Sequence, residues 1–328
     1  MSQIPVSFSI RLPNSGPYTT ASSVASVAIL ADELGFEALT VHDHISRSRR
    51  QNRHFSAGSV EQVKDTQDPI LYEAMITLAF AASLTKKIRL FPTGITLGTR
   101  DPRLLAKQVA TLHELSGKRF MLGVTVGAAA DEFEIMQVPF TERGRRADEY
   151  LAVVHQIFGP DPLTTVNGAT VHFTNGEFYP KPDNLPIWIC GKGKAAMRRV
   201  ARYGSGFLPA GFSLDNYREK MPLLDEQMAL ASRRRSDIVC GLETFVLVRS
   251  DKERAVDDSN ATLMYWYKEM EKGLNCNLIG TPESIAEQIH SYIEIGVRHF
   301  ELKFIAKSVE DQLDMMRAVA AYVVPKFT

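Results

Sequence analysis

The sequence predicts an α/β fold in which eight parallel strands close into a (β/α)8 TIM barrel, with loop insertions on the carboxyl-terminal face of the barrel. About eight strand-like segments alternate with helix-like segments along the 328 residues, and such alternation requires parallel strands joined by right-handed crossovers. A closed barrel and a doubly wound open sheet both satisfy this rule. The strand count favours the barrel, and no G-x-G-x-x-G run follows the first strand, which argues against a dinucleotide-binding sheet.

Short apolar runs rich in β-branched and aromatic residues predict the strands, and apolar residues that repeat at the helical period predict the helices. The predicted strands are residues 6–10, 38–41, 88–91, 120–124, 187–189, 206–209, 239–248 and 298–304. The predicted helices are residues 22–34, 69–84, 102–115, 142–158, 194 onward, 214–232, 253–271, 282–294 and 309–323. Thr281 and Gly296, for example, are the expected cap and stop of one helix.

Two stretches interrupt the alternation, and we expect both to be insertions in one domain that spans residues 1–328. Residues 46–68 are polar, basic and irregular, which is typical of a long surface loop that acts as a lid or is disordered. Residues 159–184 combine Pro, Gly and Asn with alternating apolar residues and predict a β-hairpin. In a barrel the working loops follow the strands, so functional residues are expected there.

Composition excludes several classes of function. The 38 basic residues balance the 38 acidic residues, so no charge field favours nucleic acid or a membrane surface. No apolar window reaches the length of a membrane span, and the amino terminus enters a strand-like run without a targeting leader. Cys190, Cys240 and Cys276 are scattered, so they predict no metal site. They fit a reducing cytosol, and we expect a cytoplasmic protein.

The stretch from residue 185 to residue 204 has the pattern of a phosphate cradle. A strand runs into a turn spaced by two glycines, and a new helix then offers unpaired amides and the positive end of its dipole. A plain connecting loop is an equally open alternative. The predicted contacts are Gly191, Lys192, Gly193, Lys194 and Ala195, with the backbone amides favoured over the lysine side chains.

Motifs at the strand ends occur together along the whole chain. They are residues 41–45 (VHDHI), 88–102 (IRLFPTGITLGTRDP), 104–108 (LLAKQ), 122–127 (LGVTVG), 132–134 (EFE), 138–146 (VPFTERGRR), 186–191 (PIWICG), 278–283 (LIGTPE) and 296–300 (GVRHF). In combination and in order they resemble the bacterial-luciferase-like family, from the first strand to the last. The resemblance implies a barrel that binds reduced FMN or the deazaflavin coenzyme F420. Residues 122–146 resemble the F420-using branch more closely.

The resemblance implies that His44 and Asp43 are the catalytic residues. His44 would lie beside the reactive face of the flavin, where an imidazole can exchange a proton with substrate or stabilise an oxygen adduct by hydrogen bonding. Asp43 would orient His44. His42 is expected to point to the opposite side if the strand continues. From the residues alone, a histidine that caps the loop or bonds to Asp43 is the alternative.

The resemblance also implies where the flavin ring lies. Thr93, Gly94 and Ile95 correspond to the place where the family has a non-proline cis peptide under the ring, so we expect the Gly94–Ile95 bond to be cis and Thr93 to donate to a ring atom. Gly127 is expected at the ring edge. Ala128 stands where some F420-using relatives carry a carboxylate or tryptophan, which weakens any general acid at that position.

Several charged residues remain open between a functional and a structural interpretation. Glu132 and Glu134 could supply acid chemistry or lie on a surface helix. Arg143, Arg145 and Arg146 could contact phosphate, although a solvated helix start with a Glu142–Arg146 pair also explains them. The basic loop from Arg47 to Lys64 could be a lid or a substrate determinant. It could meet an anionic substrate or the acidic tail of F420.

These features predict an oxidoreductase that uses F420 for hydride transfer to or from a small organic substrate. The alternative is an FMNH2-dependent monooxygenase that activates O2 and needs a flavin reductase partner. A further alternative is a flavin-binding protein without activity. A phosphate-binding isomerase or aldolase is disfavoured because Lys303 lies inside the last predicted strand rather than at its end. Family analogy implies a homodimer packed through barrel helices, with the apolar helix 73–84 as a candidate.

Overall fold

The predicted TIM barrel is confirmed. The computed structural model describes residues 4–46 and 70–327. Within these residues, eight parallel strands follow one another around the barrel, and the third is interrupted, with β3 pairing with β2 and β4 pairing with β5. A parallel bridge between Leu90 and Phe120 helps to close the ring. The barrel strands are β1 (Ser7–Arg11), β2 (Ala38–Val41), β3 (Arg89–Pro92) with β4 (Ile95–Thr96), β5 (Leu122–Thr125), β8 (Ile187–Ile189), β9 (Gly206–Phe207), β10 (Val239–Val248) and β12 (His299–Phe304).

The first and last strands of the chain are neighbours, which fixes the barrel's closure in register. Ser7 pairs with His299 and Ser9 with Glu301, while the other edge of β1 pairs with β2. A further short strand, β11 (Leu278–Gly280), pairs with the end of β10. Neither β4 nor β11 is among the predicted strands.

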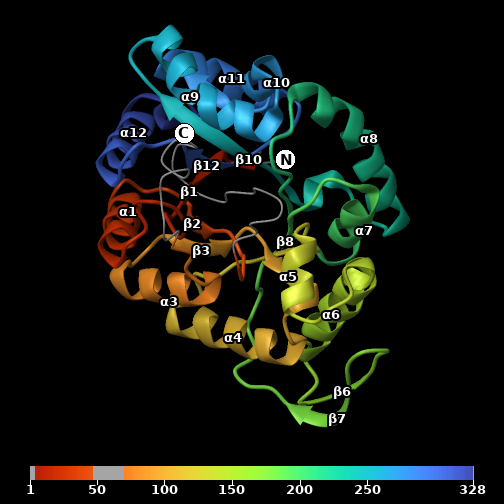
Figure 1. Cartoon of the computed structure of the whole chain (residues 1–328). Helices are drawn as coiled ribbons and strands as arrows, with labels where there is room; N and C mark the ends of the chain where they lie inside the picture. Colours follow the sequence, from red (N-terminus) through yellow and green to blue (C-terminus); the bar gives the residue numbers. More distant parts are fainter. Residues whose placement is uncertain (1–3, 47–69, 328) are drawn as a thin grey trace.

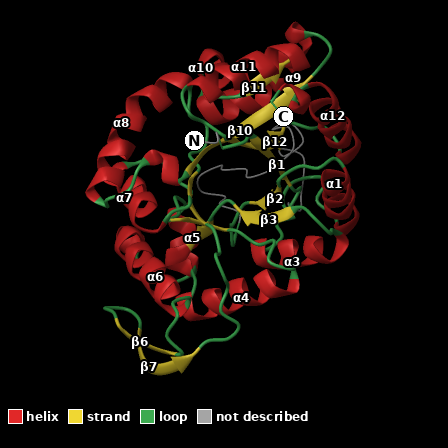
Figure 2. Cartoon of the chain, turned by 180° about the vertical axis from the view of Figure 1, so that it is seen from behind, coloured by secondary structure: helices red, strands yellow, loops and turns green. Residues whose placement is uncertain are grey.

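Helices surround the barrel as a ring (Figures 1 and 2). They are α1 (Ala21–Glu33), α3 (Ala74–Leu84), α4 (Pro102–Leu115), α5 (Ala130–Ile135), α6 (Arg143–Ile157), α7 (Lys194–Tyr203), α8 (Leu214–Leu230), α9 (Lys252–Tyr267), α10 (Met270–Asn275), α11 (Pro282–Glu294) and α12 (Val309–Tyr322). Side chains cap many of their amino ends. Asp101 accepts from Arg103 N at the start of α4, and Thr281 accepts from Ser284 N at the start of α11, satisfying amides that the helix leaves unpaired.

Two predicted helices differ from the structure. The prediction of one helix over residues 253–271 is wrong, because Lys268 adopts the left-handed conformation (φ 64°) and separates α9 from α10. The helix expected from residue 69 begins at Ala74, since Glu73 is extended and its side chain accepts from Ile76 N as the cap. The predicted hairpin is confirmed as β6 (Leu163–Asn167) and β7 (His172–Glu177), which are antiparallel and project away from the barrel (Figure 1).

Over residues 4–46 and 70–327, no helix is long and apolar enough to cross a bilayer. Nor do His, Cys, Asp and Glu side chains within those ranges gather into a cluster that could hold a metal ion.

A polar histidine lies deep in the barrel interior. His299 is almost fully buried, at 1% exposure, and its two ring nitrogens contact Ser7 Oγ (2.8 Å) and Ser9 Oγ (3.0 Å). The rings of Trp188 and Phe91 pack against it, with centroids at 5.1 and 6.1 Å. Burial lowers the pKa of His299 from 6.5 to about 3, so the ring is neutral in the folded protein near neutral pH.

This burial predicts an acid-sensitive stability. Between pH 6.5 and about 3 the unfolded chain protonates His299 while the folded protein does not, so the stability present above pH 6.5 is lost as pH falls, by up to about 1.4 kcal/mol per pH unit. His299→Gln should flatten the dependence of the unfolding free energy on pH in this window, measured by urea denaturation. His290→Gln on α11, where the ring is exposed, is the control. An unchanged slope for His299→Gln would contradict the prediction.

Candidate active site

A cavity of about 570 Å³ opens at the carboxyl ends of the strands and extends into the barrel interior. This size and position suit a small ligand in a TIM barrel. Its walls come from most of the strands and from α9. The polar, charged and aromatic side chains that line it include Arg11, His42, His44, Thr93, Glu132, Cys190, Lys192, Glu243, Phe245, Trp266, Tyr267 and Lys303.

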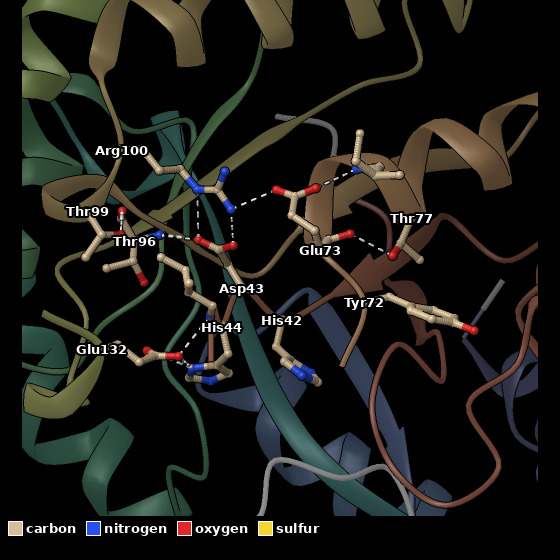
Figure 3. A network of polar contacts seen from close by, with 12 residues as sticks. His42, Asp43, His44, Tyr72, Glu73, Thr77, Thr96, Thr99, Arg100 and Glu132 are labelled. Atoms are coloured by element: carbon tan, nitrogen blue, oxygen red, sulfur yellow. Dashed lines mark hydrogen bonds and ion pairs between the residues drawn. The ribbon is translucent and has the colours of Figure 1, made fainter. Parts of the chain in front are cut away.

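His44 lies on the cavity wall and is held by a carboxylate from another element (Figure 3). Its Nδ1 lies 3.1 Å from both Oε1 and Oε2 of Glu132, which is buried on α5. The backbone amide of Ile45 also donates to Glu132 Oε1, at 2.9 Å. Glu132 therefore fixes both the imidazole and the chain that follows it, which is the function the sequence analysis assigned to Asp43.

Asp43 instead anchors the turn after β2. Its Oδ2 accepts from Thr96 N at 2.9 Å, and its carboxylate forms an ion pair with Arg100. Arg100 Nη2 also donates to Glu73 Oε1 at 2.8 Å, and Glu73 caps α3 (Figure 3). Asp43 thus ties the loop that carries His44 to β4 and α3, and it holds the loop rather than the ring.

The expectation that His42 points away from His44 is wrong. Both rings line the cavity, with centroids 5.3 Å apart. Residues two apart in extended backbone project to the same side, and it is the intervening Asp43 that projects to the other. Burial, with a smaller contribution from neighbouring His44, lowers the pKa of His42 well below 6.5. His42 is therefore a neutral wall residue at physiological pH.

The predicted non-proline cis peptide is present, but one bond earlier than predicted. The cis bond joins Thr93 to Gly94, not Gly94 to Ile95. The glycine is required for packing against the next strands, because a Cβ on Gly94 would lie 3.0 Å from both Cys190 Sγ and the carbonyl carbon of Val124. Ile95 is fully buried in the core at the start of β4.

Thr93 Oγ1 takes part in a buried hydrogen-bond network within the protein. It donates to Glu301 Oε1 at 2.8 Å and accepts from Arg11 Nη2 at 3.1 Å. A hydroxyl has a single hydrogen, and here it is directed to Glu301. Donation from Thr93 to a flavin ring atom stays a prediction.

Gly127 lines the cavity in a conformation that only glycine adopts readily. Its φ is +80°, and an added Cβ would lie 2.7 Å from Thr96 Cγ2 and 2.8 Å from Phe133 Cε2. The backbone at Gly127 and Ala128 therefore forms a bare wall, as expected where a flat ring approaches the chain closely.

The predicted cradle has the expected local structure. Helix α7 begins at Lys194, and its first hydrogen bonds run from Ala196 N and Met197 N to Gly193 O, at 2.9 and 3.2 Å. The earlier amides of the turn therefore belong to the open end of the helix. A side chain on Gly193 would meet nothing within 4 Å. The turn therefore leaves open space next to the cavity wall at Gly191.

The lysines of this loop have different surroundings. Lys194 is exposed, with its ammonium 3.9 Å from the Glu226 carboxylate. Lys192 lines the cavity, and its ammonium lies 5.8 Å from the centroid of the Phe212 ring.

The arginines after α5 form contacts at the start of α6, which is the structural alternative to phosphate binding given by the sequence analysis. Arg145 and Arg146 pair with Glu142 at 3.1 and 3.0 Å, and Arg143 lies over the Phe140 ring, 3.9 Å from its centroid. None of them lines the cavity. The basic loop predicted as a lid, residues 47–64, lies outside the described residues.

A buried charged network that the sequence analysis missed lies in the barrel interior. Arg11 Nη2 is 2.5 Å from Glu301 Oε1 and 3.3 Å from Glu243 Oε1, and Lys303 Nζ is 3.4 Å from Glu243 Oε1. Thr40 and Thr93 hydroxyls also donate to Glu301 Oε1. The available signal was the presence of charged residues inside apolar strands, as in residues 239–248 and 299–304.

The charges shift one another's protonation. Burial raises the pKa of Glu301, and Arg11 only partly offsets this. Burial also acts to raise the pKa of Glu243, but Lys303 and Arg11 outweigh it and lower that pKa. Of the two carboxylates, Glu243 therefore has the lowered pKa and Glu301 the raised pKa.

The closed barrel, its polar cavity at the strand ends and the open helix end beside it define a TIM-barrel enzyme. The family model for luciferase-like monooxygenases matches residues 4–299. The protein belongs to this family.

Named relatives include two kinds of enzyme. The chain is 24% identical over 333 residues to an F420-dependent glucose-6-phosphate dehydrogenase of Nakamurella multipartita, covering 91% of this chain and 93% of that protein. It is 25% identical over 237 residues to an FMNH2-dependent dimethylsulfone monooxygenase of Pseudomonas fluorescens, covering 61% and 64%. Among solved structures, an F420-dependent secondary alcohol dehydrogenase with an F420–acetone adduct superposes with a TM-score of 0.82 at 16% identity, over 99% of both chains. The predicted family and enzyme class, an oxidoreductase or monooxygenase, are confirmed.

Proposed function

We propose that this protein is an F420-dependent oxidoreductase that transfers a hydride to or from a small organic substrate. The observation that carries the proposal is the His44–Glu132 pair on the cavity wall, because reduction of a carbonyl or oxidation of an alcohol needs a proton donor or acceptor beside the substrate oxygen. The alternative is FMNH2-dependent oxygenation, which would need a flavin reductase as partner.

The residues present fit a flavin-type cofactor. Thr93 and Gly94 line the cavity where the ring would lie, and Gly127 would provide its bare edge. Ile95, the third predicted contact, is buried behind this wall at the start of β4. The amides from Gly191 to Ala195, with exposed Lys194 nearby, would hold the phosphate at the α7 amino terminus. The Lys192 side chain lines the cavity instead, so residue 192 would contribute its backbone amide to the phosphate. When bound, reduced F420 supplies a hydride, whereas reduced FMN supports oxygen chemistry.

The residues of the chain supply proton transfer and orientation. Glu132 holds His44 Nδ1, so we assign proton exchange with the substrate oxygen to His44 Nε2. Asp43 and Arg100 fix the loop that carries the imidazole, which keeps this nitrogen at a constant position. Such positioning lowers the entropy cost of proton transfer.

Two observations favour F420 over FMN. The cavity wall carries several ionisable groups, among them His44, Glu243 and Lys303, which suits a reaction that moves a proton with each hydride better than one that must exclude water and stray protons. In addition, the likeness to the F420-dependent relative covers nearly the whole chain.

The test is a titration of purified protein with F420 and with FMN, each oxidised and reduced, followed by absorbance and fluorescence. We expect micromolar affinity for F420 and much weaker binding of FMN, with substrate-dependent hydride transfer under anaerobic conditions. Tight binding of reduced FMN with oxygen uptake would establish the alternative. Stoichiometric cofactor binding without turnover on any substrate would favour a non-catalytic flavin-binding protein.

We also propose one domain over residues 1–328 in a cytoplasmic protein. The first and last strands pair side by side, so neither half of the chain closes a barrel alone. All three cysteines are free, which fits a reducing compartment.

Homodimerisation through α3 is the expected assembly. Ile76, Phe80 and Leu84 recur every four residues on this helix and are 69%, 41% and 36% exposed, an apolar stripe that a second copy would cover. Ile76→Glu with Phe80→Glu should convert the dimer to a monomer in sedimentation equilibrium. Leu230→Glu on α8, also exposed, is the control. A monomeric native protein, or a dimer that survives the double change, would contradict this interface.

A further inference from the structure

The cavity has a second wall whose chemistry the cofactor does not use. β3 and β10 are four strands apart around the barrel, so the wall built from β10, β12 and α9 faces the wall at Thr93 and Gly94. The proposed function places the flavin ring at the Thr93 and Gly94 wall. The substrate then lies against the wall built from β10, β12 and α9. We define this substrate wall as Glu243, Phe245, Trp266, Tyr267 and Lys303.

Lys303 presents a charged group on this wall. Its ammonium lies 3.4 Å from Glu243 Oε1, 4.3 Å from the Phe245 ring centroid and 5.4 Å from the Trp266 ring centroid. The two rings and the carboxylate hold the ammonium in place. An ammonium has three N–H donors, and the side chain reaches the cavity with 17% exposure.

Positive charge exceeds negative charge on this side of the cavity. Arg11 has its own carboxylate, Glu301, at 2.5 Å. Glu243 is shared between Arg11 and Lys303. Lys192 at the rim adds a third cation, and within residues 4–46 and 70–327 its ammonium has no carboxylate at ion-pair distance. Three cations therefore face two carboxylates, an excess of one positive charge.

The neutral polar side chains beside this wall already hydrogen-bond within the protein, so few of them are available to bind a neutral polar substrate. Asn277 Oδ1 accepts from Phe245 N at 2.8 Å, and its Nδ2 donates to Gly273 O at 2.7 Å. Tyr267 Oη is 3.4 Å from the same Asn277 oxygen, and Thr244 donates to Phe245 O at 3.1 Å. These groups hold the protein together, so on the substrate wall it is Lys303 that can donate to a ligand.

We infer that the substrate is a small organic monoanion with an apolar or aromatic body, and that its charged group, such as a carboxylate, binds the Lys303 ammonium. The body lies against Phe245 and Trp266, and Lys192 attracts the anion at the rim. A dianion would exceed the single uncompensated charge and meet Glu243. Lys303 is a specificity-determining residue in this scheme, and His44 keeps the proton transfer. The inference rests on the proposed function for the place of the cofactor.

The test compares ligands of one shape and different charge. Benzoate, benzamide and phenyl phosphate are titrated by calorimetry into the protein saturated with its cofactor, and again without cofactor. Benzoate should bind about tenfold tighter than benzamide, with phenyl phosphate weaker than benzoate. Lys303→Met, and Lys303→Met with Glu243→Gln to avoid an unpaired carboxylate, should abolish the preference for benzoate. Lys118→Met, which removes an exposed lysine paired with Asp183, should retain it.

The outcomes separate this inference from the proposed function. Equal affinity for benzoate and benzamide, no detectable binding of benzoate, or a preference that survives in the folded double variant would overturn the inference. Tighter binding of phenyl phosphate would overturn the assignment of a monoanion. If neither F420 nor FMN binds but the benzoate preference depends on Lys303, the cofactor proposal fails and the anion site stands. Cofactor affinity in Lys303→Met should stay within about twofold of the native value, because the lysine lies on the opposite wall.

Discussion

Replacing His44 with asparagine should lower kcat by about 10²- to 10⁴-fold, the usual contribution of a positioned general acid or base. Asparagine can still donate to Glu132, which holds His44 Nδ1 at 3.1 Å, so the loop should keep its place. It cannot exchange a proton near neutral pH. The measurement is the steady-state rate with the substrate found in the anaerobic screen, followed by the absorbance change of the cofactor. Cofactor affinity is measured alongside and should change by less than about twofold.

Glu132→Gln is the matched variant for this experiment. The amide oxygen can still accept from Ile45 N, which donates to Glu132 at 2.9 Å in the native protein, but the negative charge beside the imidazole is lost. We expect a smaller fall in kcat than in His44→Asn, because the imidazole remains but loses the carboxylate that holds its Nδ1. Full activity in His44→Asn would remove His44 from the reaction and with it the argument for proton-coupled hydride transfer.

Arg11→Met should lower the free energy of unfolding by about 3–5 kcal/mol, as expected when one partner of a buried ion pair is removed. The change leaves Glu301 fully buried without its cation, 2.5 Å away in the native protein. Equilibrium urea denaturation followed by circular dichroism gives the difference. Methionine fills most of the volume of the arginine stem, so the lost free energy of unfolding comes from charge and hydrogen bonding rather than from a cavity.

The double variant Arg11→Met with Glu301→Gln tests this cause. Glutamine keeps an acceptor for the Thr40 and Thr93 hydroxyls, which lie 2.7 and 2.8 Å from Glu301 Oε1, and removes the buried charge, so much of the lost stability should return. Arg103→Met, which breaks an exposed pair with Asp101, should cost less than about 1 kcal/mol. A double variant as unstable as Arg11→Met would show that packing, not the uncompensated carboxylate, sets the loss.

Local pattern was sufficient for much of the secondary structure. The predicted strands at 38–41, 187–189 and 239–248 match β2, β8 and β10 residue for residue. Helices α4 and α11 also match, because Asp101 and Thr281 begin them with side-chain caps and proline in the first turn. The break at Lys268 could not be predicted, since nothing in its local sequence requires a left-handed residue.

The site residues also divide into those that a local pattern predicts and those that only the folded structure brings together. The cavity residues His44 and Gly127, and the glycine-spaced turn before α7, could be predicted because each has a local or family signature. Glu132 was only one of two candidates, and its pairing with His44 joins residues 88 positions apart. The network of Arg11, Glu243, Glu301 and Lys303 was missed, since a charged residue in a strand shows its side of the barrel only when register is known.

The sequence by itself determined the alternation of strands and helices, the helix caps, the glycine-spaced turn before α7 and the kind of enzyme. These depend on hydrophobic period, on backbone preferences of neighbouring residues and on motifs. Only the tertiary structure decided that Glu132 rather than Asp43 holds His44, that the cis bond precedes Gly94, and that Lys303 faces a ligand cavity. The reason is physical: barrel closure brings strands from opposite ends of the chain together, and their side-chain partners follow from register and not from proximity in sequence.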